Sequence, residues 1–181
     1  MLGQQSIPRV SGDIEWARVD ADDIIHLLFI DLFYFGHVPA AMTLKICVAQ
    51  LNFVVGDMAG NAQKIIDCAT TAYQDGARLV LTPELSLCGY AAEDLFLRPS
   101  FIQACDDALK TVSAALSGLK GLHVVVGHPS GGDERTRSVS VQRRFNMASV
   151  VCEGQVVASY TKRELPNYQV FDERRYFVTG D

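Results

Sequence analysis

The stretch RLVLTPELSLCGY, residues 78–90, joins a short apolar run to a single glutamate. Residues 78–82 predict a short buried strand of the kind found in a layered α/β protein. Glu84 follows Pro83 at the point where this strand gives way to a loop. A carboxylate at such a corner either points into water or has a partner or a chemical task, because an unpaired buried charge is costly.

The flanking sequence alternates between strand and helix patterns. Strand-like runs occupy residues 44–51 and 122–129, helical periods occupy 61–76 and the stretch from 99 onward, and a hairpin occupies 145–161. We expect Asn61 to cap the first helix and Gly76 to close it. Pro99 is expected to begin the second helix, and Glu153 and Gly154 to form the hairpin turn. This order predicts an α/β layered protein with helices packed on a mixed sheet.

The bulk composition limits the function classes. The chain has 181 residues, 49% of them hydrophobic, and a net charge of -5, which suits one globular domain and argues against nucleic-acid binding. Its five cysteines and four histidines show no zinc-ligand spacing, so we expect no metal site. The odd number of cysteines in apolar segments indicates reduced thiols and a cytoplasmic protein.

Residues 1–41 differ from the rest of the chain. Their apolar stretch at 24–38 contains Asp31 and follows acidic residues, which fits neither a signal peptide nor a membrane span. Met42 opens MTLKICVAQLN, which is typical of a domain's first strand. We therefore expect residues 1–41 to be an atypical extension, from a misassigned start codon or as a structural N-terminal helix, and residues 42–181 to be the domain.

A second unusual cluster is YTKRELPNYQVFDERRYF, residues 160–177. Lys162 ends the predicted hairpin, so it also lies where a strand gives way to a loop. Ligands and catalytic groups of layered α/β folds gather beyond strand ends. Glu84 and Lys162 are therefore expected to meet at one rim of the sheet, as a structural ion pair or as part of a site. The loop at 165–171 is apolar and aromatic, which is unusual for a simple solvated connection, and it is expected to pack down if the ion pair is structural.

These two stretches resemble the glutamate and lysine motifs of the nitrilase, or carbon–nitrogen hydrolase, superfamily. The longer form KRELPNYQVFDERRYF is similar to one branch, the N-terminal glutaminase domain of glutamine-dependent NAD synthetases. LKICVAQLNFVVGDMAGN, VVVGHP and FNMASVVCEGQVVASYTK fit the same branch, so the resemblance runs from residue 44 to about 181. It implies a nitrilase-like α-β-β-α sandwich, incomplete at its C-terminus.

The resemblance also implies roles for individual residues. The family uses a Glu–Lys–Cys triad, in which Glu84 matches the general base and Lys162 matches the group that stabilises the oxyanion. Tyr90 and Tyr168 match positions that shape the glutamine pocket, and Phe171 and Glu173 are further candidates there. Glu173 is expected either to bind the α-amino group of glutamine or to act as a second structural acid near the lysine.

The resemblance places the nucleophilic cysteine some tens of residues beyond the lysine motif, so we expect it to be absent from this chain. We expect all five cysteines to be packing residues and the chain alone to be inactive, as an N-terminal piece of a longer enzyme. That enzyme would release ammonia from glutamine through a cysteine thioester, for the amidation of deamido-NAD in a second domain that uses ATP and Mg.

The first domain needs no cofactor in this interpretation. Glutamine is the expected partner, the full-length enzyme is expected to be a homo-oligomer, and neither nucleic acid nor membrane is expected to bind. Two alternatives remain open: another amidase of the nitrilase superfamily, and a non-catalytic remnant.

Overall fold

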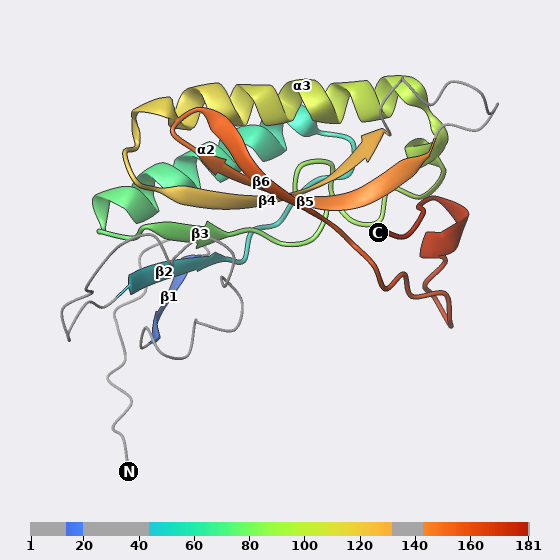
Figure 1. Cartoon of the computed structure of the whole chain (residues 1–181), viewed down its shortest axis with the longest axis horizontal. Helices are drawn as coiled ribbons and strands as arrows, with labels where there is room; N and C mark the ends of the chain where they lie inside the picture. Colours follow the sequence, from blue (N-terminus) through green and yellow to red (C-terminus); the bar gives the residue numbers. More distant parts are fainter. Residues whose placement is uncertain (1–13, 20–43, 132–142, 181) are drawn as a thin grey trace, which may run out of the picture.

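The computed structural model describes residues 14–19, 44–131 and 143–180, the first of these ranges by its backbone alone (Figure 1). Its elements, in chain order, are β1 (Ile14–Val19), β2 (Leu44–Ala49), α2 (Met58–Gln74), β3 (Leu79–Leu81), η2 (Glu93–Leu97), α3 (Pro99–Ala115), η3 (Leu116–Gly118), β4 (His123–Gly131), β5 (Arg144–Cys152), β6 (Gln155–Thr161) and η5 (Glu173–Arg175).

The strands form one mixed sheet in the order β1-β2-β3-β4-β5-β6. β2, β3 and β4 are parallel, and α2 and α3 lie in the connections between them, as two successive crossovers require. β4, β5 and β6 are antiparallel, and β5 and β6 form the predicted hairpin around Glu153 and Gly154. The α/β class and the mixed sheet expected from the sequence are therefore confirmed.

Both helices pack on one face of the sheet (Figure 1). Alternate strand residues such as Cys47, Val80 and Val126 share a buried core with Ile65 of α2 and Val112 of α3. A second buried cluster, which includes Leu85, Phe96 and Phe177, lies where the loop after β3 meets the C-terminal segment. The described residues thus form one helical layer and one sheet layer.

The start of α2 differs from the prediction. The helix begins at Met58, and the carboxylate of Asp57 caps it by accepting a hydrogen bond from the Gly60 amide at 2.9 Å. Asn61 lies inside the helix and is fully buried. Its side chain instead bonds both backbone groups of Val54 and the carbonyl of Leu87. Asparagine is a common helix cap because its side-chain amide can bond the free backbone groups at a helix start. The Asn61 amide instead bonds backbone groups of two neighbouring loops.

The opposite face of the sheet is more open in the described residues. Val48 is 41% exposed and Tyr160 is 57% exposed. Their neighbours along the strands face the helices, so both side chains point to the other side. Gly127, Asn146 and Lys162 belong to this second face by the same alternation and by the pairing of their strands.

The structure places six residues of the expected N-terminal extension in the sheet, as its edge strand β1. The β1 backbone pairs antiparallel with β2, from Ile14 opposite Ala49 to Val19 opposite Leu44. The rest of that expectation falls on residues 1–13 and 20–41, outside the described residues. The domain boundary at residue 42 stays a prediction.

Candidate active site

Gly127 brings the loop after β3 onto the second face of the sheet. A Cβ atom at this position would lie 2.6 Å from both the Leu85 nitrogen and the Pro83 oxygen. Only a residue without a side chain allows the loop backbone to cross β4 so closely. The Gly127 carbonyl also accepts a hydrogen bond from the Leu87 amide at 3.1 Å. The crossing delivers Glu84 to the neighbouring strands β5 and β6.

Glu84, Lys162 and Asn146 meet at this point. The Lys162 ammonium donates to Oε1 of Glu84 at 2.7 Å, and the Asn146 amide donates to the same oxygen at 2.5 Å. Asn146 comes from β5 and Lys162 follows the last residue of β6, where the Lys162 amide bonds the Asn146 carbonyl at 2.9 Å. The expected meeting of Glu84 and Lys162 at one rim of the sheet is therefore confirmed. Their catalytic roles stay predictions.

Glu173 is the second carboxylate of the cluster. It lies at the start of η5, and its Oε1 accepts from Lys162 at 2.9 Å. Its side chain is only 7% exposed, against 44% for Glu84 and 27% for Lys162. Oε2 of Glu173 is buried without a hydrogen-bond partner among the described residues. Of the two roles expected for Glu173, this geometry favours the acid that holds the lysine.

The two carboxylates keep Lys162 charged. Partial burial by itself lowers the pKa of Lys162, but the hydrogen bonds to Glu84 and Glu173 outweigh it and hold the pKa above its ordinary value. Partial desolvation, followed by the negative charges of Glu173 and Glu84, raises the pKa of the Tyr90 phenol. Tyr90 therefore belongs electrostatically to the cluster and is neutral at physiological pH.

The loop beyond Lys162 packs down only in part. Leu165 is buried, whereas Tyr168 is 63% exposed and Val170 is 88% exposed. The Tyr168 and Phe171 rings contact each other edge to face, with centroids 5.6 Å apart. The loop is therefore exposed at Tyr168 and Val170 but half-buried at Phe171. The Tyr168 ring stands at the surface, in contact with the Phe171 ring.

All five cysteines lie within the described residues, and none of them hydrogen-bonds to Glu84 or Lys162. Cys88, which is closest to Glu84 in sequence, is fully buried, and its thiol donates to the carbonyls of Leu85 and Gly89. Cys47 lies 4.0 Å from Cys68, sulfur to sulfur, in the helix-side core. A thiol in such a setting is a packing group.

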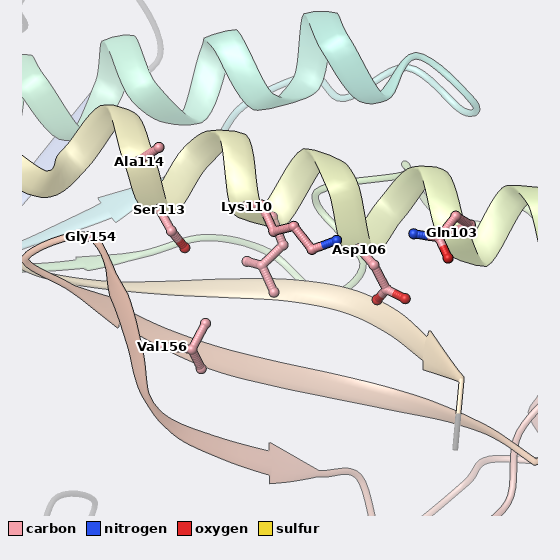
Figure 2. A pocket seen from close by; sticks show the side chains of 8 residues that line it. Gln103, Asp106, Lys110, Ser113, Ala114, Gly154 and Val156 are labelled. Carbon is pink, nitrogen blue, oxygen red and sulfur yellow. The ribbon is translucent and has the colours of Figure 1, made fainter. Parts of the chain in front are cut away.

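An open cavity of about 580 Å³ lies elsewhere, between α3 and the turn of the β5–β6 hairpin (Figure 2). Asp106, Lys110 and Ser113 line it from the helix, and Val156 lines it from β6. Burial raises the pKa of the Asp106 carboxyl group, partly opposed by His128. None of the predicted site residues lines this cavity, so it is separate from the Glu84–Lys162 cluster.

Two residues of the site escaped the sequence analysis. Asn146 carries a usable signal, because asparagine is rare within strands and here interrupts the apolar run at 145–152. Gly127 falls in the strand-like run at 122–129, and its residue type alone does not mark it as part of a site. It lies within β4, and its role depends on a loop crossing that residue patterns cannot reveal.

Within residues 44–131 and 143–180, no group of three or more histidine, cysteine or acidic side chains is placed to hold a metal ion. In the same part of the chain, no helix has the length and apolar character that crossing a membrane requires.

Comparison with known proteins gives a consistent result. The family model described as carbon-nitrogen hydrolase matches residues 45–181. The glutamine-dependent NAD(+) synthetase of Xylella fastidiosa is 46% identical over 135 residues, which are 74% of this chain and 23% of that protein. The corresponding synthetase of Thermotoga maritima is 38% identical over 138 residues, or 76% of this chain and 22% of that protein.

Solved structures agree with the sequence relatives. The glutamine-dependent NAD+ synthetase of Acinetobacter baumannii, solved with ADP, matches with a TM-score of 0.65 and 37% identity, over 76% of this chain and 24% of that one. An amidase from Nesterenkonia sp. matches with a TM-score of 0.60 and 27% identity, over 76% of this chain and 48% of that one. These similarities confirm the expected nitrilase-like fold as a partial domain. The chain spans about a quarter of the synthetases that it resembles.

Proposed function

Because the chain belongs to the carbon–nitrogen hydrolase family, whose model matches residues 45–181, we propose that it supplies the general base and the lysine of a glutamine-hydrolysing site. The observation that carries this proposal is the 2.7 Å contact between Glu84 and Lys162. The two residues lie 78 positions apart in the chain and come from different strand ends, yet both fall in family motifs.

The proposed reaction cleaves the side-chain amide of glutamine. Glu84 takes the proton of a cysteine thiol, and the thiolate sulfur attacks the amide carbon. Lys162 stabilises the negative charge on the carbonyl oxygen of the tetrahedral intermediate. Collapse of the intermediate breaks the C–N bond and releases ammonia, with Glu84 returning its proton to the leaving nitrogen. Water activated by Glu84 then hydrolyses the thioester to glutamate and the free thiol.

The reaction needs a nucleophilic thiol in addition to Glu84 and Lys162, and we propose that none of the chain's five cysteines provides it. Each cysteine is a core residue or lies away from Glu84, so we assign the thiol to a segment outside these 181 residues. The chain alone is then inactive, because it has a base and an oxyanion donor but no acceptor for the acyl group.

Glutamine is favoured over simpler amides by the relatives. The glutamine-dependent synthetase of Xylella fastidiosa is 46% identical to the chain over the matched residues, whereas the Nesterenkonia amidase is 27% identical. Tyr90 belongs electrostatically to the charged cluster, and we assign it, with Tyr168 and Phe171, to the wall that receives the substrate's aliphatic part. Glu173, whose Oε1 accepts from Lys162 and whose Oε2 is buried, is assigned to holding that lysine and not to the substrate's α-amino group.

The relatives are named glutamine-dependent NAD(+) synthetases, a name that links the use of glutamine to the synthesis of NAD. We propose that the ammonia is passed to a second domain, which would use ATP and Mg to amidate deamido-NAD. In this proposal the enzyme works in the cytoplasm as a homo-oligomer.

A hybrid enzyme tests the function. Residues 45–181 of this chain replace the corresponding residues of the Xylella fastidiosa synthetase, which supplies the remaining sequence. We expect this hybrid enzyme to release ammonia from L-glutamine and the Glu84→Gln version to be inactive while it remains folded. A folded hybrid enzyme without glutaminase activity, beside an active parent synthetase, would count against the proposal.

A further inference from the structure

Asn146 and Lys162 donate to the same oxygen of Glu84. The Asn146 amide reaches Oε1 at 2.5 Å and the Lys162 ammonium reaches it at 2.7 Å. Oε2 of Glu84 receives no hydrogen bond from the described residues, and the Glu84 side chain is 44% exposed. The two oxygens of this carboxylate are therefore unequal: one is occupied by two donors and the other is free.

Asn146 is built into the sheet more firmly than either charged residue. It is 3% exposed and lies opposite Pro129 in the β4–β5 ladder. Its carbonyl also accepts the backbone amide of Lys162 at 2.9 Å. One residue thus fixes the side chain of Glu84 and the backbone of Lys162. Its amide must present the NH₂ group to Glu84, because a carbonyl oxygen there would face another acceptor.

We propose that Asn146 is a positioning residue that fixes Oε1 of Glu84 and so leaves Oε2 as the oxygen that accepts the proton. The role of Glu84 as a base in this inference rests on the proposed function, whereas the hydrogen bonds that Asn146 and Lys162 make to Glu84 do not depend on the substrate. Glu84 lies in the loop after β3 and is almost half exposed, so without Asn146 only the Lys162 side chain restrains its carboxylate. The base would then spend less time in the orientation that proton transfer requires.

Lys162 reports on the position of Glu84 in the intact 181-residue chain. Its pKa is raised by the hydrogen bond to Glu84, so a carboxylate that moves away must lower that pKa and increase the fraction of reactive amine. Competitive labelling of lysines with acetic anhydride between pH 8 and 11 measures this quantity for each lysine. Lys120 is 70% exposed and pairs with Glu153 elsewhere, so it provides the internal reference.

Two variants define the outcome. Glu84→Gln removes the whole contribution of the carboxylate, and we expect it to increase Lys162 labelling at pH 9 several-fold relative to Lys120. Asn146→Leu keeps a similar side-chain volume but removes the amide donor. In this variant we expect the logarithm of Lys162 labelling, relative to Lys120, to rise by at least half as much as in Glu84→Gln. Wild-type labelling in folded Asn146→Leu, beside a clear increase in Glu84→Gln, would overturn the proposal. No change in either variant would overturn it as well.

A measurement on Asn146 itself covers the case in which Asn146→Leu does not fold. The side-chain amide protons of Asn146, one of which is donated to the Glu84 carboxylate, should resonate at a different chemical shift in Glu84→Gln, where the acceptor is uncharged, and at an unchanged shift in Glu173→Gln. Asn146 side-chain resonances that are identical in the wild type and in Glu84→Gln would overturn the contact.

Steady-state kinetics of the hybrid enzyme provide a separate test. Asn146→Leu should lower kcat about 10–100-fold, the range of one hydrogen bond to a charged group, while KM changes less than about twofold. An unchanged kcat would overturn the positioning role. An inactive but folded hybrid enzyme would contradict the proposed function, while lysine labelling would still decide the role of Asn146.

Discussion

Replacing Gly127 with alanine tests whether the loop crossing over β4 positions Glu84. The new Cβ would lie 2.6 Å from the Leu85 nitrogen and the Pro83 oxygen and 3.1 Å from the Glu84 carbonyl carbon. All three are backbone atoms, so no side chain can rotate away. Ordinary contacts begin at 3.4 Å, so the loop must retreat by about 0.8 Å.

That retreat has two measurable consequences. Overpacking of this kind costs about 1–3 kcal/mol of unfolding free energy, which for a domain of this size lowers Tm by about 2–12 °C. The same movement would lengthen the 2.7 Å contact between Glu84 and Lys162 beyond hydrogen-bonding distance. Thermal denaturation followed by circular dichroism measures the first effect, and lysine labelling at Lys162 measures the second.

Gly131 provides the matched control on the same strand. A Cβ at Gly131 would meet only a methyl carbon of Ile102, at 3.6 Å, which is an ordinary contact. Gly131→Ala should therefore leave Tm within about 1–2 °C of the wild type. If Gly127→Ala proves as stable as Gly131→Ala and leaves Lys162 labelling unchanged, the argument for the crossing is refuted.

Three further predictions concern stability and activity. Burial lowers the pKa of His128 below its value in the unfolded chain, so protonation favours unfolding and the free energy of unfolding should fall as pH drops below about 6.5. The difference between the urea midpoints at pH 7.5 and pH 5.5 should therefore be smaller in His128→Asn than in the wild type. Asn61→Ala leaves buried backbone groups of two loops without hydrogen bonds and should lower the free energy of unfolding, measured with urea, by about 1–3 kcal/mol. Gln63 is exposed on the same helix, so Gln63→Ala should lower it little. The purified 181-residue chain should release no ammonia from L-glutamine, and turnover that Cys88→Ala abolishes would show that we have misassigned the nucleophile.

The sequence predicts the architecture well because its strands and helices follow strong local patterns. The apolar run before Pro83, the hairpin turn at Glu153 and Gly154, and Pro99 at the start of α3 each depend on neighbouring residues alone. The helix start at Met58 was missed because both Asp57 and Asn61 can cap, and only tertiary contacts separate the two.

The site was predictable only in its charged members. Glu84 and Lys162 stand out because each follows a strand in a family motif. Asn146 and Gly127 lie inside strands, and their importance arises from a loop that approaches from 40 or more residues earlier in the chain. The exposure of Tyr168 and Val170 was also missed, because an apolar loop predicts burial only where the fold has a surface to receive it.

We propose above that Glu84, held beside Lys162, is the base of a glutamine-hydrolysing site. The most direct test is the rate of ammonia release from L-glutamine by the hybrid enzyme, measured for the wild-type sequence and for Glu84→Gln under identical conditions. For this proposal we expect kcat to fall about 10²–10⁴-fold, the range for removing a general base, with the folded structure retained. A Glu84→Gln hybrid enzyme that turns over glutamine at the wild-type rate would contradict it.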